Sequence, residues 1–210
     1  MLAPPMFLYF SHAHFPVTAL GYGRRVGIWL QGCSLGCPGC VAPQTWTRTA
    51  AHRVELGALV AGLRRFLSSA DGVTISGGEP FEQPRALRAL IAAVRRECAG
   101  GDIVVYSGRP AAWLRRRHAA ILAEIDVLIP EPFIESARPT HPLAGSGNQP
   151  VLLLSELARR RYGARPTNSP GRIDIAPAAD RLRLAGIPRR GEIARLGAVA
   201  AATTGELHPS

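Results

Sequence analysis

Three cysteines lie within eight residues of the chain, at Cys33, Cys37 and Cys40, in the sequence CSLGCPGC. Thiolates bind iron or zinc, and three of them this close together can hold a metal centre that is still one protein ligand short. A four-iron cubane suits such a loop, because three irons take the thiolates and the fourth stays open to a small molecule. Gly36 and Gly39 allow the tight backbone curl that this requires.

A structural zinc site is the alternative, and it needs a fourth protein ligand. Cys98 follows Val94 by four residues on an apolar helical stripe, which indicates a buried helix residue. Nothing in the spacing of His12, His14 or His52 favours them as the missing ligand. Val41 directly follows Cys40, where c-type haem attachment requires His, and the spacing differs from that of two-cluster ferredoxins. The spacing therefore favours an iron–sulfur site over zinc.

The elements that must position this loop alternate between strand and helix. Short apolar runs predict strands at residues 26–30, 72–76, 102–106 and 126–130. Helical spacing of apolar residues predicts helices at residues 56–66, 87–98 and 114–125. Residues 151–154 read as a strand or the start of a helix, and residues 173–175 and 182–184 read as two late strands.

Repeated strand–helix units predict an α/β fold with a parallel sheet covered by helices. A full eight-unit barrel typically needs about 250 residues, and this chain has 210. We therefore predict an incomplete (β/α)6-type partial TIM barrel of five or six units. The length predicts a single domain over residues 1–210. We expect its core to run from about residue 20 to 190 and the residues after about 200 to be frayed.

Four loops that carry candidate functional residues each follow a predicted strand: residues 33–40, 77–80, 106–108 and 131–133. In parallel α/β folds the chemistry lies beyond the carboxyl ends of the strands, where such loops meet. The sequence therefore predicts one shared site rather than several unrelated features.

The formal net charge is +10, and all 25 basic residues are Arg. Such a charge ordinarily suggests nucleic acid or an acidic partner. Here the Arg residues fall mostly on polar faces of predicted helices, as in the run from Arg115 to Arg117, which indicates solvated surface. We therefore expect no nucleic-acid partner.

The chain carries no sign of a membrane or secreted protein. No apolar stretch approaches the roughly 20 residues of a membrane span, and the apolar run at residues 6–10 is too short for a signal sequence. Four Cys, three of them tightly clustered, do not make a disulfide scaffold. These features predict a cytoplasmic protein without a membrane partner.

Two motifs at neighbouring strand ends carry a resemblance to a known family. The three-cysteine loop and the segment Ser76-Gly77-Gly78-Glu79-Pro80 together resemble the hallmarks of the radical S-adenosylmethionine superfamily. Residues 27–33 and 43–46 resemble, more narrowly, the activating proteins of anaerobic ribonucleotide reductase and related glycyl radical enzymes. Residues 106–108, 145–149 and 184–188 also look like family segments, so that the resemblance spans roughly residues 20 to 190.

The resemblance implies the radical S-adenosylmethionine fold and a [4Fe-4S] cluster on Cys33, Cys37 and Cys40. S-adenosylmethionine would chelate the fourth iron, and one electron from the cluster would cleave it to a 5′-deoxyadenosyl radical. The resemblance also implies a protein substrate, with the enzyme acting as an activase that installs a glycyl radical on a partner enzyme. A one-electron donor such as flavodoxin or ferredoxin would reduce the cluster.

Other site residues follow from the same resemblance. Gly77, Gly78 and Glu79 would contact the methionyl part of S-adenosylmethionine, because paired glycines permit close approach and a carboxylate accepts from an ammonium group. Gly39 and Val41 would lie near the adenine. A plain strand-to-helix turn is the other interpretation of the glycine segment.

Several residues keep two interpretations. Ser107 either hydrogen-bonds the cofactor or is a polar turn residue. Asn148 and Gln149 match a family segment but could instead cap backbone groups. We interpret His118 as a structural histidine, and Trp29 and Trp46 as packing residues.

The chain departs from the activators in three places. Tyr22 stands where they have a proline, Glu131-Pro132 where they have Asp-Gly, and Pro150 where they often have Arg. One alternative is therefore a radical enzyme that modifies a peptide or a small molecule. An alternative of another class is a non-catalytic zinc-binding or electron-carrier module.

Overall fold

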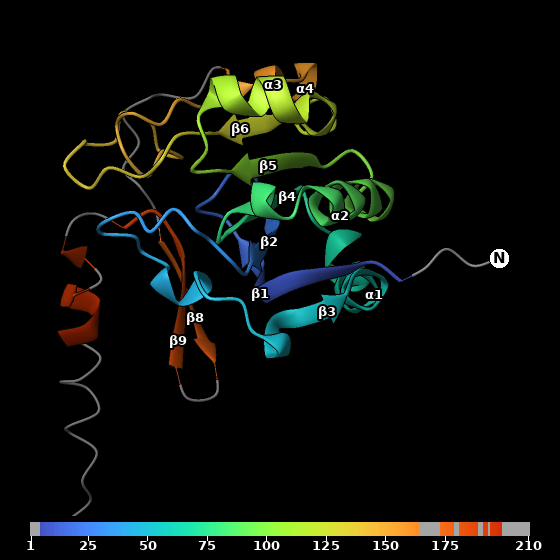
Figure 1. Cartoon of the computed structure of the whole chain (residues 1–210), viewed down its shortest axis with the longest axis horizontal. Helices are drawn as coiled ribbons and strands as arrows, with labels where there is room; N and C mark the ends of the chain where they lie inside the picture. Colours follow the sequence, from blue (N-terminus) through green and yellow to red (C-terminus); the bar gives the residue numbers. More distant parts are fainter. Residues whose placement is uncertain (1–4, 164–172, 179–180, 189–190, 193, 199–210) are drawn as a thin grey trace, which may run out of the picture.

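A computed structural model describes residues 5–163, 173–178, 181–188, 191–192 and 194–198. Seven of its strands form one sheet in the order β3-β1-β2-β4-β5-β6-β7 (Figure 1). These strands are β1 (Phe7–Val17), β2 (Arg25–Leu30), β3 (Arg53–Glu55), β4 (Gly72–Gly77), β5 (Asp102–Tyr106), β6 (Val127–Ile129) and β7 (Leu152–Leu153). The remaining two, β8 (Ile173–Ala178) and β9 (Arg181–Gly186), pair with each other as an antiparallel hairpin.

The centre of the sheet is parallel. Strands β2, β4, β5 and β6 run in the same direction, with Leu30 opposite Gly77 at the carboxyl ends of the first two. Every residue of β2 is buried, as are the first four of β4 and of β5. Burial on both faces explains why these strands read as continuous apolar runs rather than alternating ones.

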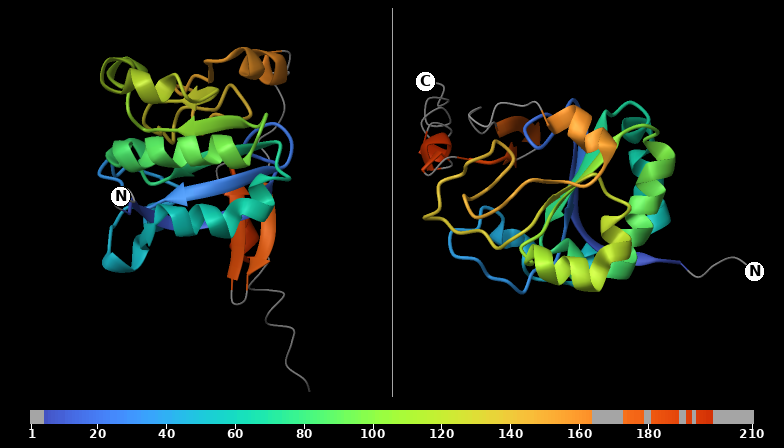
Figure 2. Two further views of the ribbon diagram at one scale, coloured as in Figure 1. Left: turned by 90° about the vertical axis from the view of Figure 1, so that its right-hand side faces the viewer. Right: turned by 90° about the horizontal axis from the view of Figure 1, so that it is seen from above.

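Three helices cover one face of the sheet, and loops lie over the other (Figure 2). The helices are α1 (Leu56–Leu67), α2 (Pro84–Glu97) and α3 (Ala111–Leu122), and a short helix α4 (Glu156–Tyr162) follows β7. On α2 the buried stripe of Leu87, Leu90, Ile91 and Val94 recurs at helical spacing. Short 3-10 turns occur at Pro43–Thr45, Ala50–His52 and Pro80–Glu82.

The predicted α/β class and parallel centre are confirmed, but the number of parallel units is lower than the predicted five or six. In the described part of the chain, four strands are parallel, while β1, β3 and β7 pair antiparallel with their neighbours. The Pro-rich segment of residues 130–150 contains no helix that would carry β7 across the sheet, so β7 returns antiparallel.

Strand β1 was not predicted, because His12, His14 and Pro16 interrupt its apolar pattern. The late strands at residues 173–175 and 182–184 are confirmed as parts of β8 and β9. Asp174 fastens the hairpin to the end of β1 by accepting from the Thr18 and Ala19 amides, at 2.5 and 2.9 Å. The end after residue 200, expected to be frayed, lies outside the described residues.

The amino-terminal edge of the parallel strands is held by a buried ion pair. Arg25 Nη2 lies 3.0 Å from Asp102 Oδ2, and both side chains are fully buried. Arg25 Nε also donates to Thr74 Oγ1 at 2.7 Å, and the Tyr162 hydroxyl donates to Asp102 at 2.7 Å. Burial alone would raise the pKa of Asp102, but the charge of Arg25 and the hydrogen bonds that Asp102 accepts from Arg25 and Tyr162 hold it below its usual value.

Cys98 lies at this same edge. It ends α2, its thiol donates to the Ala70 carbonyl at 3.4 Å, and a Cβ on Gly101 would meet its sulfur at 2.4 Å. Cys98 is buried as expected, with 3% of it exposed, but it directly follows the last residue of α2 instead of lying within the helix.

Candidate functional site

Two strand ends bring the cysteine loop and the paired glycines together. Glycine is required at Gly77, where φ is +104°, and at Gly78, where a Cβ would lie 2.3 Å from the Gly32 carbonyl oxygen. The Gly78 amide donates to the Leu30 carbonyl and the Glu79 amide to the Gly32 carbonyl, both at 2.8 Å. The backbone after β4 is therefore packed directly against the start of the cysteine loop.

The cysteine loop returns to the strand from which it leaves. The Gly32 amide donates to the Thr45 carbonyl at 2.7 Å, and the Cys33 amide donates to the Trp46 carbonyl at 3.0 Å. The side chain of Gln31 closes the base of the loop by donating to the Gln44 and Thr47 carbonyls at 2.8 and 2.7 Å. Both ends of the loop are thus fixed to one point beyond β2.

Cys33, Cys37 and Cys40 are partly exposed, whereas Cys98 is buried at the opposite edge of the sheet. Among the described residues, no three His, Cys, Asp or Glu side chains are grouped as ligands of a single metal ion. A cubane does not need that grouping, because each thiolate binds a different iron. The three accessible thiols on one curled loop fit a [4Fe-4S] cluster with one open iron.

The thiol of Cys33 lies among acidic neighbours. Burial raises its pKa, the charges of Glu79 and Glu82 raise it further, and hydrogen bonds from the Leu35 and Gly36 backbone oppose this rise. A metal ligand must be the thiolate, so a cluster bound here would displace the proton that this surrounding favours.

Glu79 joins the end of β4 to the loop after β5. The residue is 1% exposed, and its carboxylate accepts from the Phe81 amide at 2.9 Å, the Ser107 hydroxyl at 2.9 Å and the Gly108 amide at 2.8 Å. Burial raises the pKa of Glu79, and these three hydrogen bonds oppose the rise. Glu79 and Ser107, both predicted as site residues, are therefore in direct contact.

Glu82 is a site residue that the sequence did not reveal. One carboxylate oxygen, Oε1, accepts from the Ser34 amide at 2.8 Å and from the Ser34 hydroxyl at 2.6 Å. Arg48 pairs with Oε2 at 3.1 Å, and Arg109 pairs with Oε1 at 3.2 Å. Burial alone would raise the pKa of Glu82, but the Ser34 hydrogen bonds and the two Arg charges lower it below its usual value.

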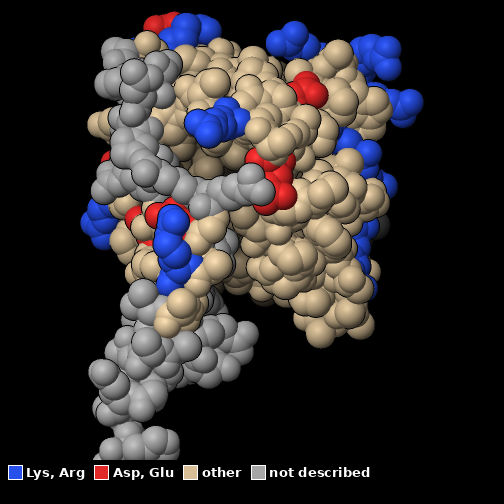
Figure 3. Space-filling model, turned by 90° about the vertical axis from the view of Figure 1, so that its left-hand side faces the viewer, with Lys and Arg blue, Asp and Glu red and all other residues tan. Residues whose placement is uncertain are grey.

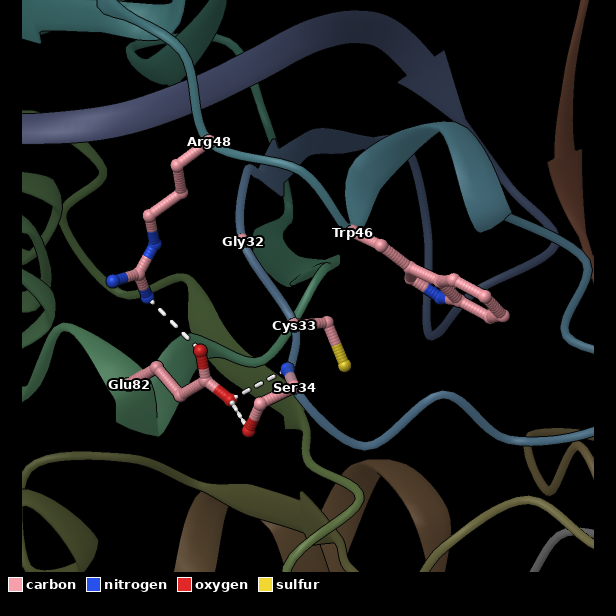
Figure 4. Close-up of a pocket in the computed structure, with 6 residues that line it drawn as sticks. All are labelled: Gly32, Cys33, Ser34, Trp46, Arg48 and Glu82. Atoms are coloured by element: carbon pink, nitrogen blue, oxygen red, sulfur yellow. Dashed lines mark hydrogen bonds and ion pairs between the residues drawn. The ribbon is translucent and has the colours of Figure 1, made fainter.

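These groups border a shallow pocket of about 250 Å³ beside the first cysteine (Figure 4). Its lining consists of Gly32, Cys33, Ser34, Trp46, Arg48 and Glu82. Figure 4 shows the Cys33 thiol pointing away from Glu82 and Arg48, on the side of Trp46. Glu82, paired with Arg48, thus contacts the cysteine loop through Ser34, on the side opposite to the Cys33 thiol, and leaves that thiol free to bind a metal. Trp46, expected to pack around the loop, also lines this pocket.

The loop after β6 is braced by its own polar groups. Glu131 has a φ of +82° and caps α3 by accepting from the Ala111 amide at 2.9 Å. Asn148 donates to the Pro132 carbonyl and Gln149 to the Glu131 carbonyl, each at 2.8 Å. The amides of Asn148 and Gln149 therefore cap backbone groups.

Gly39 and Val41 lie on the outer part of the cysteine loop. A Cβ on Gly39 would meet Glu135 Cδ at 2.8 Å, so the β6–β7 connection passes beside this glycine. Val41 is 54% exposed. Within the described part of the chain, neither residue is hydrogen-bonded to Glu79 or to Ser107.

The aromatic residues singled out from the sequence are packed against other rings. Trp29 stacks on His12, with ring centroids 4.6 Å apart. His118 packs against Phe81 and Trp113, at 5.2 and 5.1 Å. Burial lowers the pKa of His118, which fits the structural role predicted for it.

The face drawn in Figure 3 carries scattered charges on a mostly uncharged surface. Arg and acidic side chains lie there in small groups, some of them side by side, and further Arg lie along one border. Within the described residues, no helix is long and apolar enough to cross a membrane.

Comparison with known proteins gives a family match over most of the described chain. A family model described as "4Fe-4S single cluster domain" matches residues 19–152. The anaerobic ribonucleoside-triphosphate reductase-activating protein of Vibrio cholerae is 31% identical over 147 residues, which are 67% of this chain and 95% of that protein. The protein of the same name from Haemophilus influenzae is 32% identical over 65% of this chain and 92% of its own length.

Two further proteins are similar to parts of this chain. A putative glycyl-radical enzyme activating enzyme of Haemophilus influenzae is 38% identical over 79 residues, which are 37% of this chain and 30% of that protein. The crystal structure of QueE from Escherichia coli aligns with a TM-score of 0.42 and 20% identity, covering 49% of this chain and 53% of that one.

Proposed function

We propose that this chain, which belongs to the 4Fe-4S single cluster domain family, is a radical S-adenosylmethionine enzyme. Its relatives are named as activating proteins of anaerobic ribonucleoside-triphosphate reductase. We place this chain beside them as an activase that installs a glycyl radical on such a partner.

The observation that carries the proposal is the meeting of two loops. Three accessible cysteines on a loop closed at its base lie directly against the Gly77-Gly78-Glu79 turn. Each loop follows a strand of the parallel centre, so the sheet fixes their relative position. Three thiolates suit a cluster with one open iron. The adjacent acidic turn, with its two glycines, suits the close approach of an amino-acid-like ligand.

Cys33, Cys37 and Cys40 would hold the [4Fe-4S] cluster. When bound and reduced, it would supply the electron for reductive cleavage of S-adenosylmethionine, and the 5′-deoxyadenosyl radical chemistry that this provides would act on the partner. The electron would come from a donor such as flavodoxin or ferredoxin. The chain's own residues would hold the cluster, orient S-adenosylmethionine and shield both from water.

The turn after β4 would bind the methionyl end of the cofactor. Gly77 and Gly78 leave no side chain in the way, and Glu79 supplies negative charge. An ionised carboxylate has about four acceptor positions. The protein fills three of them on Glu79, which leaves one for an ammonium group. Ser107 would act through Glu79 by fixing that carboxylate, while Gly39 and Val41 would border the adenine.

The fold supports access by a large substrate. Helices cover one face of the sheet only, so we propose that the sheet is an incomplete barrel whose loop-bearing side receives the partner (Figure 2). The whole site lies in what we propose is a single domain.

The test is anaerobic reconstitution with iron and sulfide, followed by dithionite and S-adenosylmethionine. We expect 5′-deoxyadenosine, measured by chromatography, from the wild-type chain. Cys37→Ala should lose both the cluster and the product, because it removes one of the three iron ligands. Cys98→Ala is the matched control and should retain both, because Cys98 lies at the opposite edge of the sheet.

Two results would contradict the proposal. A wild-type chain that binds one zinc ion tightly but no cluster would favour the zinc module. A full cluster that yields no 5′-deoxyadenosine, even with the partner reductase present, would favour an electron carrier. The activase role itself predicts a glycyl radical signal on the reductase by electron paramagnetic resonance.

A further inference from the structure

Glu82 connects three segments that are distant in the sequence. Ser34 belongs to the cysteine loop, Arg48 follows it, and Arg109 lies in the turn between β5 and α3. All three donate to the one carboxylate, and Arg109 Nη2 also donates to Ser34 Oγ at 3.3 Å. The connection is made through side chains, apart from the Ser34 amide, which lies directly after Cys33.

The carboxylate carries charge at this position. The side chain of Glu82 is only 17% exposed, and its pKa is lowered by the Ser34 hydrogen bonds and the two Arg. The side chains of Arg48 and Arg109 are 33% and 29% exposed, so solvent screens these charges incompletely. A fixed anion and two fixed cations therefore stand next to the first cluster ligand.

We propose that Glu82 is a positioning residue of the cluster loop, and that its charge, balanced by Arg48, sets the reduction potential of the cluster. The inference rests on the proposed function, because it requires a cluster on Cys33. A negative charge beside a cluster disfavours the added electron, and a positive charge favours it. The potential therefore depends on the balance within this group as well as on the thiolates.

Glu79, by contrast, accepts hydrogen bonds among the described residues only from its own turn and from the next strand end. Glu82 holds the loop from outside through the Ser34 amide and hydroxyl. Removal of its charge leaves two cations unpaired, whereas removal of Arg48 leaves the anion less compensated. The two changes push the potential in opposite directions.

The test compares Glu82→Gln, Arg48→Gln and Ser34→Ala by a redox titration of the reconstituted protein, followed by electron paramagnetic resonance. We expect Glu82→Gln to shift the midpoint potential upward and Arg48→Gln to shift it downward. Ser34→Ala retains every charge and should leave the potential near the wild-type value. Loss of iron to a chelator should be faster in Glu82→Gln and Ser34→Ala, because both weaken the hold on the loop.

A merely structural role would change iron loss without this pattern of potentials. Shifts of the same sign in Glu82→Gln and Arg48→Gln, or no shift in either, would overturn the proposal. So would iron loss at the wild-type rate in both Glu82→Gln and Ser34→Ala. A wild-type chain that holds no cluster would overturn the proposed function as well, whereas wild-type cleavage of S-adenosylmethionine with unchanged variant potentials would overturn this inference alone.

Discussion

Glu79 and Glu82, the two acidic residues of the site, fix different segments because their hydrogen-bond partners differ. Glu79 is enclosed by donors of its own turn and of the β5 end, so it fixes one strand end to the next. Glu82 is reached by two Arg and by Ser34, so it fixes the cysteine loop from outside. Although they are only three residues apart in the sequence, Glu79 contacts the loop after β5 and Glu82 contacts the cysteine loop.

Ser107→Ala tests the role of Ser107 in holding Glu79. It removes one of three donors to a buried carboxylate, and hydrogen bonds to charged groups contribute about 1.5–3 kcal/mol. We expect the unfolding free energy, measured by urea denaturation, to fall by about that amount. Ser136→Ala, in an exposed loop position, is the control and should be neutral. Weaker binding of S-adenosylmethionine at unchanged stability would instead mean that Ser107 contacts the cofactor directly.

The residues of the motifs were recognisable from sequence, whereas Glu82 was not. Cys33, Gly78 and Glu79 belong to compact patterns whose spacing carries their meaning. Glu82 acquires its role from Ser34, 48 positions away, and from Arg109, 27 positions away. Contacts of that kind exist only once the sheet has brought the loops together.

At the scale of elements, the strand ends decide where the chemistry lies. The predicted strands at residues 26–30, 72–76 and 102–106 agree with β2, β4 and β5 because their short apolar runs are buried on both faces. Strand β1 escaped prediction because it borders the parallel centre and carries polar residues such as His12 and His14. The direction of β7 depends on the path of a long loop, which no periodicity encodes.

Gly78→Ala tests the contact between the two loops. Its Cβ would lie 2.3 Å from the Gly32 carbonyl oxygen, and backbone cannot move aside cheaply. We expect a loss of about 1–3 kcal/mol in unfolding free energy and poor retention of the cluster. Iron content after desalting is the second measurement.

Gly62→Ala is the matched control for that substitution. Gly62 lies exposed within α1, and nothing is within 4 Å of an added Cβ. Alanine in a helix interior is favoured over glycine by up to about 1 kcal/mol. The control should therefore be slightly more stable and keep its cluster, and equal behaviour of the two variants would contradict the packing argument.

At the scale of the whole molecule, the two edges of the parallel sheet have separate tasks. The carboxyl edge carries the cysteine loop and the acidic residues of the site. The amino edge carries the buried pair of Arg25 and Asp102 together with Tyr162. The buried ion pair therefore lies at the edge away from the proposed site.

Asp102→Asn tests this division. Breaking a buried pair by removing one partner costs about 3–5 kcal/mol, because Arg25 is left buried without its anion. The folded-state pKa of Asp102 is lowered, so its stabilisation is present above the ordinary Asp value of about 3.9 and is lost as pH falls below it. We expect the difference in unfolding free energy between wild type and Asp102→Asn to be largest near neutral pH and to shrink below about pH 4. A difference independent of pH would contradict the assignment of charge to Asp102.

We propose above all that the three-cysteine loop holds a cluster whose fourth iron is open to S-adenosylmethionine. The most direct measurement is the electron paramagnetic resonance spectrum of the reduced, reconstituted protein before and after addition of S-adenosylmethionine. We predict a [4Fe-4S] signal whose shape changes on addition, because the molecule binds the iron that lacks a protein ligand. A signal that is unchanged at saturating S-adenosylmethionine would contradict the account.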